Sequence, residues 1–325
     1  MSGMLSVRLN PETRVRPTIS MLLRTSVVAF TVLASAPAVC AGPFVAYRAD
    51  DDVTVYDVAA ETHTNLTNHP ASEYTPSWSG DGRHIAFASN RTGQWDLYTM
   101  RADGTDLRRR TDTLGFEART AFSPNGRKIA YTLADEEGDP IGVVDLRTGT
   151  ETVVTAGEGV GDESVSWFPD SKRILFIRRG GGFGIYEVRV DGAMDEKLHL
   201  QSHEPALSPD GRRIAHQFNE RWITELHMFD IETGAESVIP IELGVGRKPH
   251  VPTWVSPDRL LVTDNQGDVY LVNVVTGRHK LLPVNTFWVR GFDPAHPRDV
   301  SARGKTPFTW GWLKAMGNPT VGATP

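Results

Sequence analysis

The chain contains a single cysteine, Cys40, among its 325 residues. A framework of structural disulfides is therefore excluded, and neither a thiol nucleophile nor a cysteine-rich metal site is expected. The sequence also lacks the G-x-S-x-G turn of serine hydrolases, the H-E-x-x-H zinc motif and the phosphate-binding P-loop. We accordingly predict no catalytic residue, no bound metal and no cofactor.

No apolar run is long enough to span a bilayer. The run at residues 26–36 follows four arginines and precedes a stretch of small residues that ends at Gly42. This order predicts a secretory signal peptide over residues 1–41, with Met21 as an alternative start. Once it is removed, we expect no transmembrane span and a periplasmic or secreted protein. Lipid anchoring at Cys40 is an alternative, although the bulkier Val39 precedes that cysteine.

Positive charge is scarce. The formal net charge is −6, and loss of residues 1–41 removes four Arg and one Glu, which makes it −9. Proteins that bind nucleic acid neutralise phosphates with an excess of Lys and Arg. We therefore expect no nucleic-acid partner.

Two turn motifs recur along the chain. The first reads SGDG, SPNG, FPDS, SPDG and SPDR, beginning at residues 79, 123, 168, 208 and 256. The second reads ADG, RTG, VDG, ETG and VTG, beginning at residues 102, 147, 190, 232 and 275. Pro, Asp, Asn and Gly are the residues that tight turns require. Each repeat of roughly 40–48 residues holds four short strands, which is typical of a propeller blade.

The repeats predict an all-β fold, a six-bladed β-propeller of four-stranded antiparallel blades over residues 42–294. The first repeat lacks its inner strand, whereas residues 286–294 read as an inner strand with nothing after it. We therefore predict that this C-terminal strand completes the first blade and closes the ring. Five or seven blades are the alternatives. Residues 295–325 are expected to form a tail packed on the propeller or trailing from it.

The strands differ in character as blade position requires. Second strands such as IAF at residues 85–87 are apolar on consecutive positions, as expected for strands covered on both faces. Fourth strands such as residues 106–110 are polar, which suits an outer edge. The aromatic residues that precede the first turn, among them Trp78, Phe122 and Trp167, are interpreted as packing between blades.

Residues 76–104, PSWSGDGRHIAFASNRTGQWDLYTMRADG, resemble the WD-repeat-like unit of TolB-type β-propellers. The same pattern recurs more weakly at residues 123–131 and 208–215. The resemblance implies a propeller in the periplasm or outside the cell. TolB proteins also carry an N-terminal α/β domain, which we do not expect here because the strand pattern begins at Phe44.

Counting six residues back from each first turn, and from the equivalent position after Phe292, selects the residues that start the inner strands: Glu73, Glu117, Asp162, Ser202, His250 and Phe287. The adjacent Glu163, His203 and Glu204 add to a rim that we predict to be acidic, with two histidines. Like charges in a narrow mouth focus the electric field toward a cation or a basic peptide. A hydrated mouth without a ligand is the alternative. The acidic run DDD at residues 50–52 is interpreted as a hairpin turn rather than as a cation site.

The sequence thus predicts an exported scaffold without catalysis, which binds a protein, peptide or other ligand in the cell envelope through its channel rim. An alternative is a polysaccharide-active lyase or hydrolase in which His203, His250 and the rim carboxylates act as acid and base.

Overall fold

The computed structural model describes residues 43–113, 115–134, 139–155, 161–179, 182–191, 196–199, 203–220, 223–286 and 289–292. All of them belong to one unit, Cys40–Pro325. The expected signal peptide, with Cys40, and the expected C-terminal tail lie outside these ranges. In the described part of the chain there is no helix with the length and apolar character needed to cross a bilayer.

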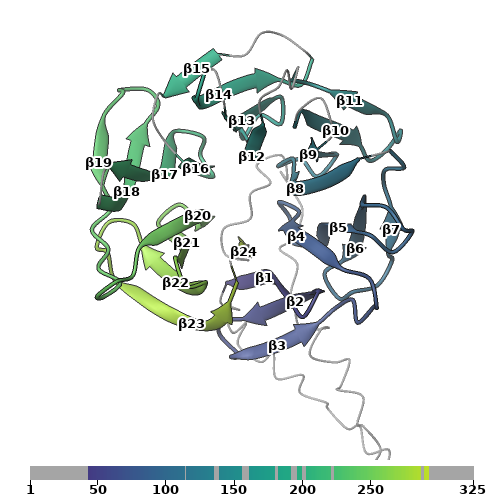
Figure 1. Cartoon of the computed structure of the whole chain (residues 1–325), viewed down its shortest axis with the longest axis horizontal. Helices are drawn as coiled ribbons and strands as arrows, with labels where there is room; N and C mark the ends of the chain where they lie inside the picture. The colour runs from purple at the N-terminus through teal and green to yellow at the C-terminus, as the bar shows by residue number, and fades with distance from the viewer. Residues whose placement is uncertain are drawn as a thin grey trace, which may run out of the picture. The chain divides into compact units, whose positions relative to one another are not determined.

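The described residues form six antiparallel sheets of four strands, arranged around a common centre (Figure 1). The strands of each blade are given below in order from the centre outward, beginning with blades 1 to 3. Blade 1 contains β24 (Val289–Phe292), β1 (Phe44–Ala49), β2 (Asp52–Asp57) and β3 (Thr62–Asn65). Blade 2 contains β4 (Glu73–Trp78), β5 (His84–Ser89), β6 (Asp96–Arg101) and β7 (Arg108–Arg109). Blade 3 contains β8 (Phe116–Phe122), β9 (Lys128–Ala134), β10 (Ile141–Asp145) and β11 (Glu151–Val153).

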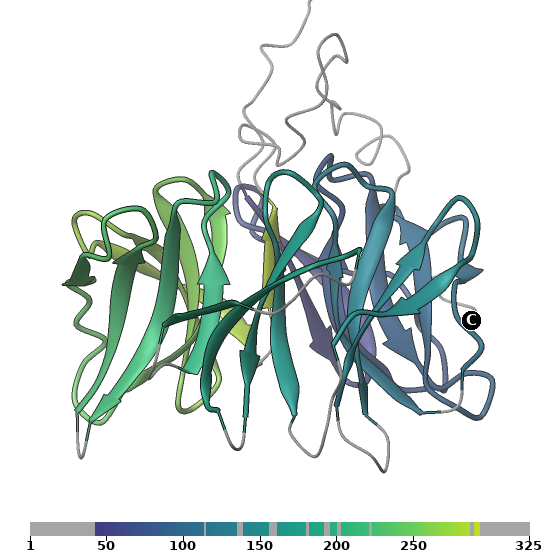
Figure 2. The same cartoon turned by 90° about the horizontal axis from the view of Figure 1, so that it is seen from above.

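The other three blades repeat this order. Blade 4 contains β12 (Asp162–Trp167), β13 (Arg173–Arg178), β14 (Gly184–Arg189) and β15 (Glu196–His199). Blade 5 contains β16 (His203–Leu207), β17 (Arg213–Glu220), β18 (Ile223–Asp230) and β19 (Glu236–Val238). Blade 6 contains β20 (Pro249–Ser256), β21 (Arg259–Asp264), β22 (Asp268–Asn273) and β23 (His279–Asn285). Figure 2 shows that the strands run between the two faces of the ring.

The predicted closure of the ring is confirmed. Strand β24 pairs antiparallel with β1, in a register that places Phe44 opposite Phe292 and Tyr47 opposite Val289. The four-stranded first blade is therefore assembled from both ends of the described chain, and the fold is the six-bladed propeller that the repeats predict.

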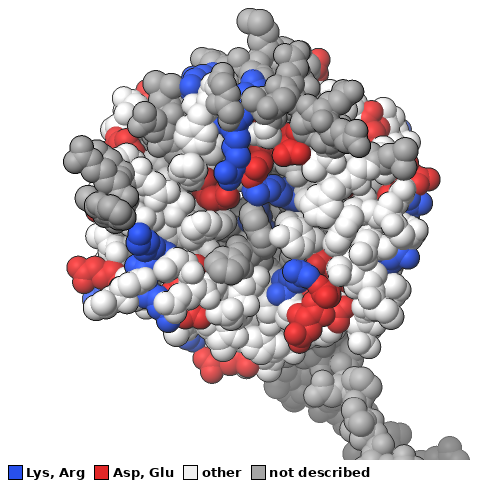
Figure 3. All heavy atoms as spheres, in the orientation of Figure 1, with Lys and Arg blue, Asp and Glu red and all other residues white. Residues whose placement is uncertain are grey.

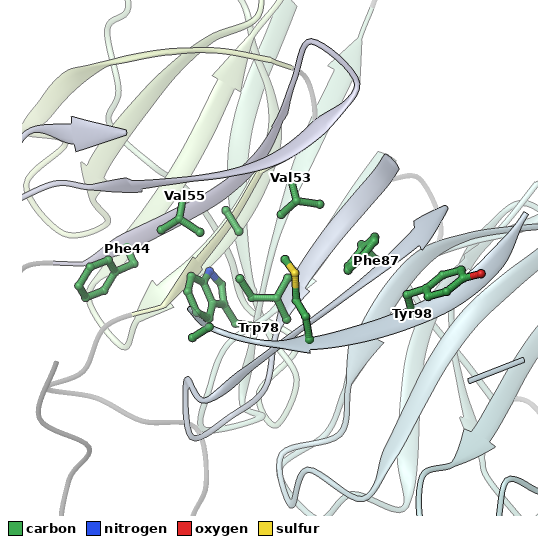
Figure 4. Packing of buried hydrophobic residues seen from close by; sticks show 10 residues of the cluster. Phe44, Val53, Val55, Trp78, Phe87 and Tyr98 are labelled. Carbon is green, nitrogen blue, oxygen red and sulfur yellow. The ribbon is translucent and has the colours of Figure 1, made fainter. Parts of the chain in front are cut away.

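The core lies between the blades. Trp78 of β4 is 7% exposed and packs with Phe44, Val53 and Val55 of blade 1, and its ring centroid lies 6.5 Å from that of Phe44 (Figure 4). The Trp167 indole donates a hydrogen bond of 2.9 Å to the Ala121 carbonyl of the preceding blade. Trp254 does the same toward Ala206, also at 2.9 Å. The interpretation of these aromatic positions as packing between blades is confirmed.

Burial falls from the second strand to the fourth, as the strand patterns indicate. Five of the six residues of β5 are buried, whereas all residues of β3, β7 and β19 are exposed. The DDD run forms the expected hairpin turn, because Asp50 and Asp51 have φ of 48° and 69° between β1 and β2. The third carboxylate, Asp52, accepts hydrogen bonds from Asn65 and Thr67 and ties β3 to β2.

Candidate binding site at the central channel

The inner strands contain an irregularity near their start. Register shifts interrupt the pairing of β4, β8, β12, β16 and β20 with their second strands. In the first four of these strands the shift coincides with a left-handed residue: Thr75, Arg119, Ser164 and Glu204, with φ between 45° and 57°. A bulge of this kind turns side chains away from strict alternation. These four residues form the central part of the candidate site.

Two positions before Thr75, Arg119 and Ser164 lie the carboxylates that the sequence count selected. Glu73, Glu117 and Asp162 are fully buried, with 0% exposure. Glu73 accepts hydrogen bonds from the Ser89 hydroxyl at 2.8 Å and from the Arg91 guanidinium at 2.9 Å. This carboxylate is therefore enclosed by its own blade and is not open to a partner.

Asp162 is enclosed by its own blade, whereas Glu117 is enclosed by blade 2 and the segment that follows it. Asp162 accepts two bonds from the Arg178 guanidinium, from Nε at 2.9 Å and from Nη2 at 3.0 Å. Glu117 accepts the Leu97 amide of blade 2 at 3.0 Å and the hydroxyls of Thr111 and Thr113. Burial raises the pKa of Glu117, and the two hydroxyls oppose that rise. The rim that the sequence predicts is thus closed at these three positions, because each carboxylate is fully covered by the protein.

The left-handed residues connect neighbouring blades through a chain of hydrogen bonds. The Arg119 amide donates to Thr75 Oγ1 at 2.9 Å, and the Arg119 guanidinium reaches Ser164 Oγ at 3.4 Å. Ser164 Oγ in turn donates to the Glu204 carboxylate at 2.8 Å. The chain therefore links the inner strands of blades 2 to 5 around the channel.

Two glutamates and two arginines form an ion cluster at the mouth of the channel. Glu163 pairs with Arg119 at 2.5 Å and with Arg179 at 2.9 Å. Glu204 lies 3.9 Å from Arg119 and 3.6 Å from Arg179. The Arg179 side chain is 44% exposed, which makes it the most accessible member. Around the central hollow, Lys and Arg spheres lie against Asp and Glu spheres (Figure 3).

A third arginine, Arg290 of β24, belongs to the same channel. Its Nη1 donates to Thr253 Oγ1 at 3.2 Å and to the Val289 carbonyl at 3.0 Å. Burial lowers the pKa of Arg290 to about 10, an effect that Glu204 opposes and Arg119 increases. Arg119, Arg179 and Arg290 are not among the residues predicted from the sequence, because that prediction rests only on the residues that start the strands and their acidic or histidine neighbours.

A cavity of about 90 Å³ opens between the inner strands, and all six blades contribute to its wall. Polar groups in the wall include Ser77, Ser164, Glu204, Thr253 and Arg290. This volume is enough for several water molecules or for one small polar group of a ligand.

His203 and His250 are close enough to interact electrostatically. Burial lowers the pKa of His203, as do the nearby Arg179 and His250, whereas Glu204 opposes the shift. The His203 ring lies 4.9 Å from that of Phe183. His250 Nδ1 is buried and has no hydrogen-bond partner among the described residues.

The position of His250 corrects the sequence count by one residue. Pro249 pairs with Asp264 as Glu73 pairs with Ser89, so Pro249 and not His250 starts the inner strand. The count fails because Val255 separates Trp254 from the turn serine Ser256, whereas Trp78 is followed directly by Ser79. His250 therefore shares a register position with His203 and Glu163. Ser202 and Phe287, the other residues selected, lie outside the described residues.

The residues described here include no group of three or more His, Cys, Asp or Glu side chains arranged to hold a metal ion. What the site offers is a set of charged hydrogen-bond donors and acceptors around a small cavity. Such a set recognises polar or charged groups of a ligand.

Comparison with known proteins agrees with this architecture. The sequence model of the TolB beta propeller domain matches residues 18–202 and 112–282. The Tol-Pal system protein TolB of Francisella tularensis subsp. mediasiatica (strain FSC147) is 27% identical over 178 residues, which are 52% of this chain and 40% of that protein. The uncharacterized peptidase YuxL of Bacillus subtilis (strain 168) is 31% identical over 172 residues, 52% of this chain and 25% of that protein. The matched part thus spans less than half the length of either relative.

Solved structures share the fold. The crystal structure of TolB from Acinetobacter baumannii superposes with a TM-score of 0.64 at 21% identity, covering 77% of this chain and 66% of that one. At this level of identity the likeness concerns the fold alone.

Proposed function

The chain belongs to the TolB β-propeller family, and we propose that it is an exported, non-catalytic scaffold that binds a protein or peptide in the cell envelope at the mouth of its central channel. The observation that carries this proposal is the ion cluster of Glu163, Glu204, Arg119 and Arg179. The cluster combines both charge signs, three of its members lie on the inner strands β8, β12 and β16, and its Arg179 is accessible to a partner.

Charge clusters of this kind give specificity, because a partner must match both signs in the correct arrangement. The curated relative from Francisella is named as a protein of the Tol-Pal system, which supports a role in the cell envelope. The signal peptide predicted over residues 1–41 supports export. The proposal places the binding surface on Glu163, His203, Glu204 and His250, together with the arginines. Glu73, Glu117 and Asp162 maintain the strands behind it.

The test is capture of a partner from envelope extract by the immobilised protein. Arg179→Glu reverses the charge of the exposed member of the cluster and is expected to reduce capture at least tenfold. Arg189→Glu is the matched control, because the Arg189 side chain is 51% exposed and pairs with Asp191 away from the channel. Equal capture by both variants and the wild type would contradict the proposal.

Export is tested separately. The amino terminus of the protein purified from the envelope fraction should be Gly42, which follows a cut after Ala41. An acylated Cys40 would indicate the lipid anchor instead, and a protein that keeps residues 1–41 in the cytoplasm would contradict export.

The alternative of an enzyme acting on a polysaccharide is favoured by one observation, the closeness of His203 and His250 with the unbonded Nδ1 of His250. A histidine pair can transfer protons if both rings reach one substrate. Turnover in a panel of glycans and esters, abolished by His250→Ala, would establish this alternative. Absence of turnover, together with partner capture that depends on Arg179, supports the scaffold.

A further inference from the structure

The ion cluster and Arg290 together carry a net positive charge, and Glu204 and Arg290 of this set line the cavity. Arg119, Arg179 and Arg290 contribute three positive charges, whereas Glu163 and Glu204 contribute two negative ones. The four members of the ion cluster pair with one another. Arg290 is the one of these five residues outside the cluster, and it adds a positive charge although the overall charge of the protein is negative.

Arg290 uses only part of its hydrogen-bonding capacity. A guanidinium carries five N–H donors in a rigid fork. Within the described residues, its hydrogen bonds come from Nη1 alone, to Thr253 Oγ1 and to its own backbone neighbour Val289. No described carboxylate forms an ion pair with it, although Glu204 is close enough to influence it electrostatically. The donors on Nε and Nη2 are therefore available to a ligand.

The surroundings of Arg290 are costly for an unpaired charge. The residue lines the central cavity together with Gly291, and the protein around it lowers its pKa to about 10. A cation whose pKa is lowered by burial gains stability when an anion joins it. The fork geometry of arginine matches the two oxygens of a carboxylate.

We propose that the cavity beside Arg290 is a binding site for a single carboxylate group, which the Arg290 fork holds. The inference deepens the proposed function, and it rests on that function where the carboxylate belongs to the bound protein or peptide. A free small carboxylate is the other source of the same chemistry.

The chemistry selects a monoanion over a dianion. One excess positive charge is neutralised by one carboxylate, whereas a phosphate dianion would leave a net negative charge beside Glu204. The cavity of about 90 Å³ is large enough for a carboxylate group. Glu204, which lines the same cavity, disfavours more highly charged anions by repulsion.

The first experiment measures the melting temperature of the purified protein in sodium acetate, sodium phosphate and sodium chloride at equal ionic strength. Ligand binding to the folded state raises the melting temperature in a saturable manner. Acetate is expected to raise it for the wild type, phosphate less and chloride not at all. Absence of a saturable acetate effect in the wild type would overturn the inference, as would phosphate binding equal to that of acetate.

Variants assign the effect to Arg290. Arg290→Gln should weaken acetate binding at least tenfold. The acetate affinity of Arg290→Lys should lie between those of the wild type and Arg290→Gln, because lysine keeps the charge but lacks the fork of donors. Glu204→Gln leaves Arg290 in place and should strengthen binding of acetate and, more, of phosphate. Arg189→Gln is the control for loss of an arginine away from the channel. Unchanged acetate affinity in Arg290→Gln contradicts the inference. If Arg290→Gln does not fold, Glu204→Gln provides the test, and acetate binding no stronger than in the wild type contradicts the inference.

The Arg179 and Arg290 variants, tested for both partner capture and acetate binding, separate this inference from the proposed function. If acetate competes with partner capture and Arg290→Gln loses capture, the carboxylate belongs to the partner. If acetate does not change partner capture but raises the melting temperature in a way that depends on Arg290, the site binds a free carboxylate. If Arg179→Glu leaves capture unchanged but Arg290 still controls acetate binding, the proposed function fails and the carboxylate site stands.

Discussion

Asp162 and Glu163 are neighbours in β12, yet they lie in opposite environments. Asp162 is fully buried and forms a two-bond pair with Arg178 of its own blade. Glu163 lies at the channel mouth and is shared by Arg119 and Arg179, which come from two different blades. Asp162 stabilises its own blade, whereas Glu163 belongs to the ion cluster whose Arg179 is exposed. The comparison shows that charge alone does not indicate which carboxylates of a propeller rim are available for binding.

The physical cause is the geometry of the inner strand. Successive side chains of a strand point to opposite sides, so one residue is covered while the next faces outward. The left-handed residue that follows, Ser164 in β12, adds a bulge that turns a third side chain toward the channel. Positions that start the strand thus stabilise the blade, and the next two line the channel.

The largest effect is expected from removing the buried member of the pair. Asp162→Ala leaves Arg178, whose side chain is only 19% exposed, without the carboxylate that neutralises it. Breaking a buried ion pair on one side should lower the free energy of unfolding by about 3 kcal/mol. Glu163→Ala should lower it by about 1 kcal/mol, because Arg179 is 44% exposed and can be hydrated, and Arg119 keeps Glu204 as a neighbour. Urea unfolding of both variants measures the difference, and equal losses would refute the distinction between the two positions.

A smaller effect is expected at the left-handed position. Ser164 has φ of 57°, a conformation that a β-branched side chain tolerates poorly. Ser164→Val should cost about 2 kcal/mol of unfolding free energy. Ser164→Gly should change it by about 0.5 kcal/mol or less, because relief of the backbone offsets the lost hydrogen bond to Glu204.

The control for this pair is Ser166→Val two residues later. Ser166 lies opposite Leu175 in β13 and is not among the residues with positive φ. Valine should be tolerated there, because β-branched residues suit ordinary strand geometry. If Ser166→Val and Ser164→Val destabilise equally, backbone conformation is not the cause.

A pH effect should appear at the buried carboxylate Glu117. Its pKa in the folded protein lies above the unfolded value, since burial disfavours the charged form. The folded state then binds the proton more tightly, so this contribution to stability is present below the unfolded pKa and is lost as pH rises through the folded pKa. Between pH 4.5 and neutral pH, the wild type should lose stability relative to Glu117→Gln. Parallel stability curves for the two proteins would contradict the raised pKa.

The smallest effect is expected from His203 at the channel mouth, with the opposite sign. Its folded pKa lies below the unfolded value, through burial and the nearby Arg179. The unfolded chain therefore gains its proton first, and stability is lost as pH falls below about 6.5. His203→Asn should lose less stability than the wild type between pH 7.5 and pH 5.5. The comparison is made by thermal unfolding at several pH values, and an identical loss in both proteins would exclude His203 as the cause.

The sequence permits prediction of the fold in considerable detail, because turn chemistry recurs in each repeat of roughly 40–48 residues. The PDG-type turns place the hairpins, and the missing inner strand of the first repeat predicts the pairing of β24 with β1. The buried tryptophans follow from their position before each first turn. Local turn geometry and burial are both visible in residue type, which is why these predictions succeed.

The candidate site is less predictable from the sequence. Thr75, Arg119, Ser164 and Glu204 adopt a conformation that glycine or asparagine normally marks, so no residue type reveals the bulge. The enclosure of Glu117 depends on hydroxyls of the neighbouring segment, and the register of His250 depends on the extra residue Val255 before the turn. Arg290 joins its opposing charges only after the ring closes. These features depend on backbone conformation and on the packing of the assembled blades, which residue type does not reveal.

The pairing of β24 with β1 has a consequence for how the protein folds. It joins Phe44 to Phe292 across nearly the whole described chain, so it is among the contacts with the largest loop to close. Such non-local contacts slow folding, because the loop must be closed before the pairing can form. Because Arg290 lies on β24, its charge joins that of Glu204 only when β24 pairs with β1. The channel therefore has its full set of charges only when the ring is closed.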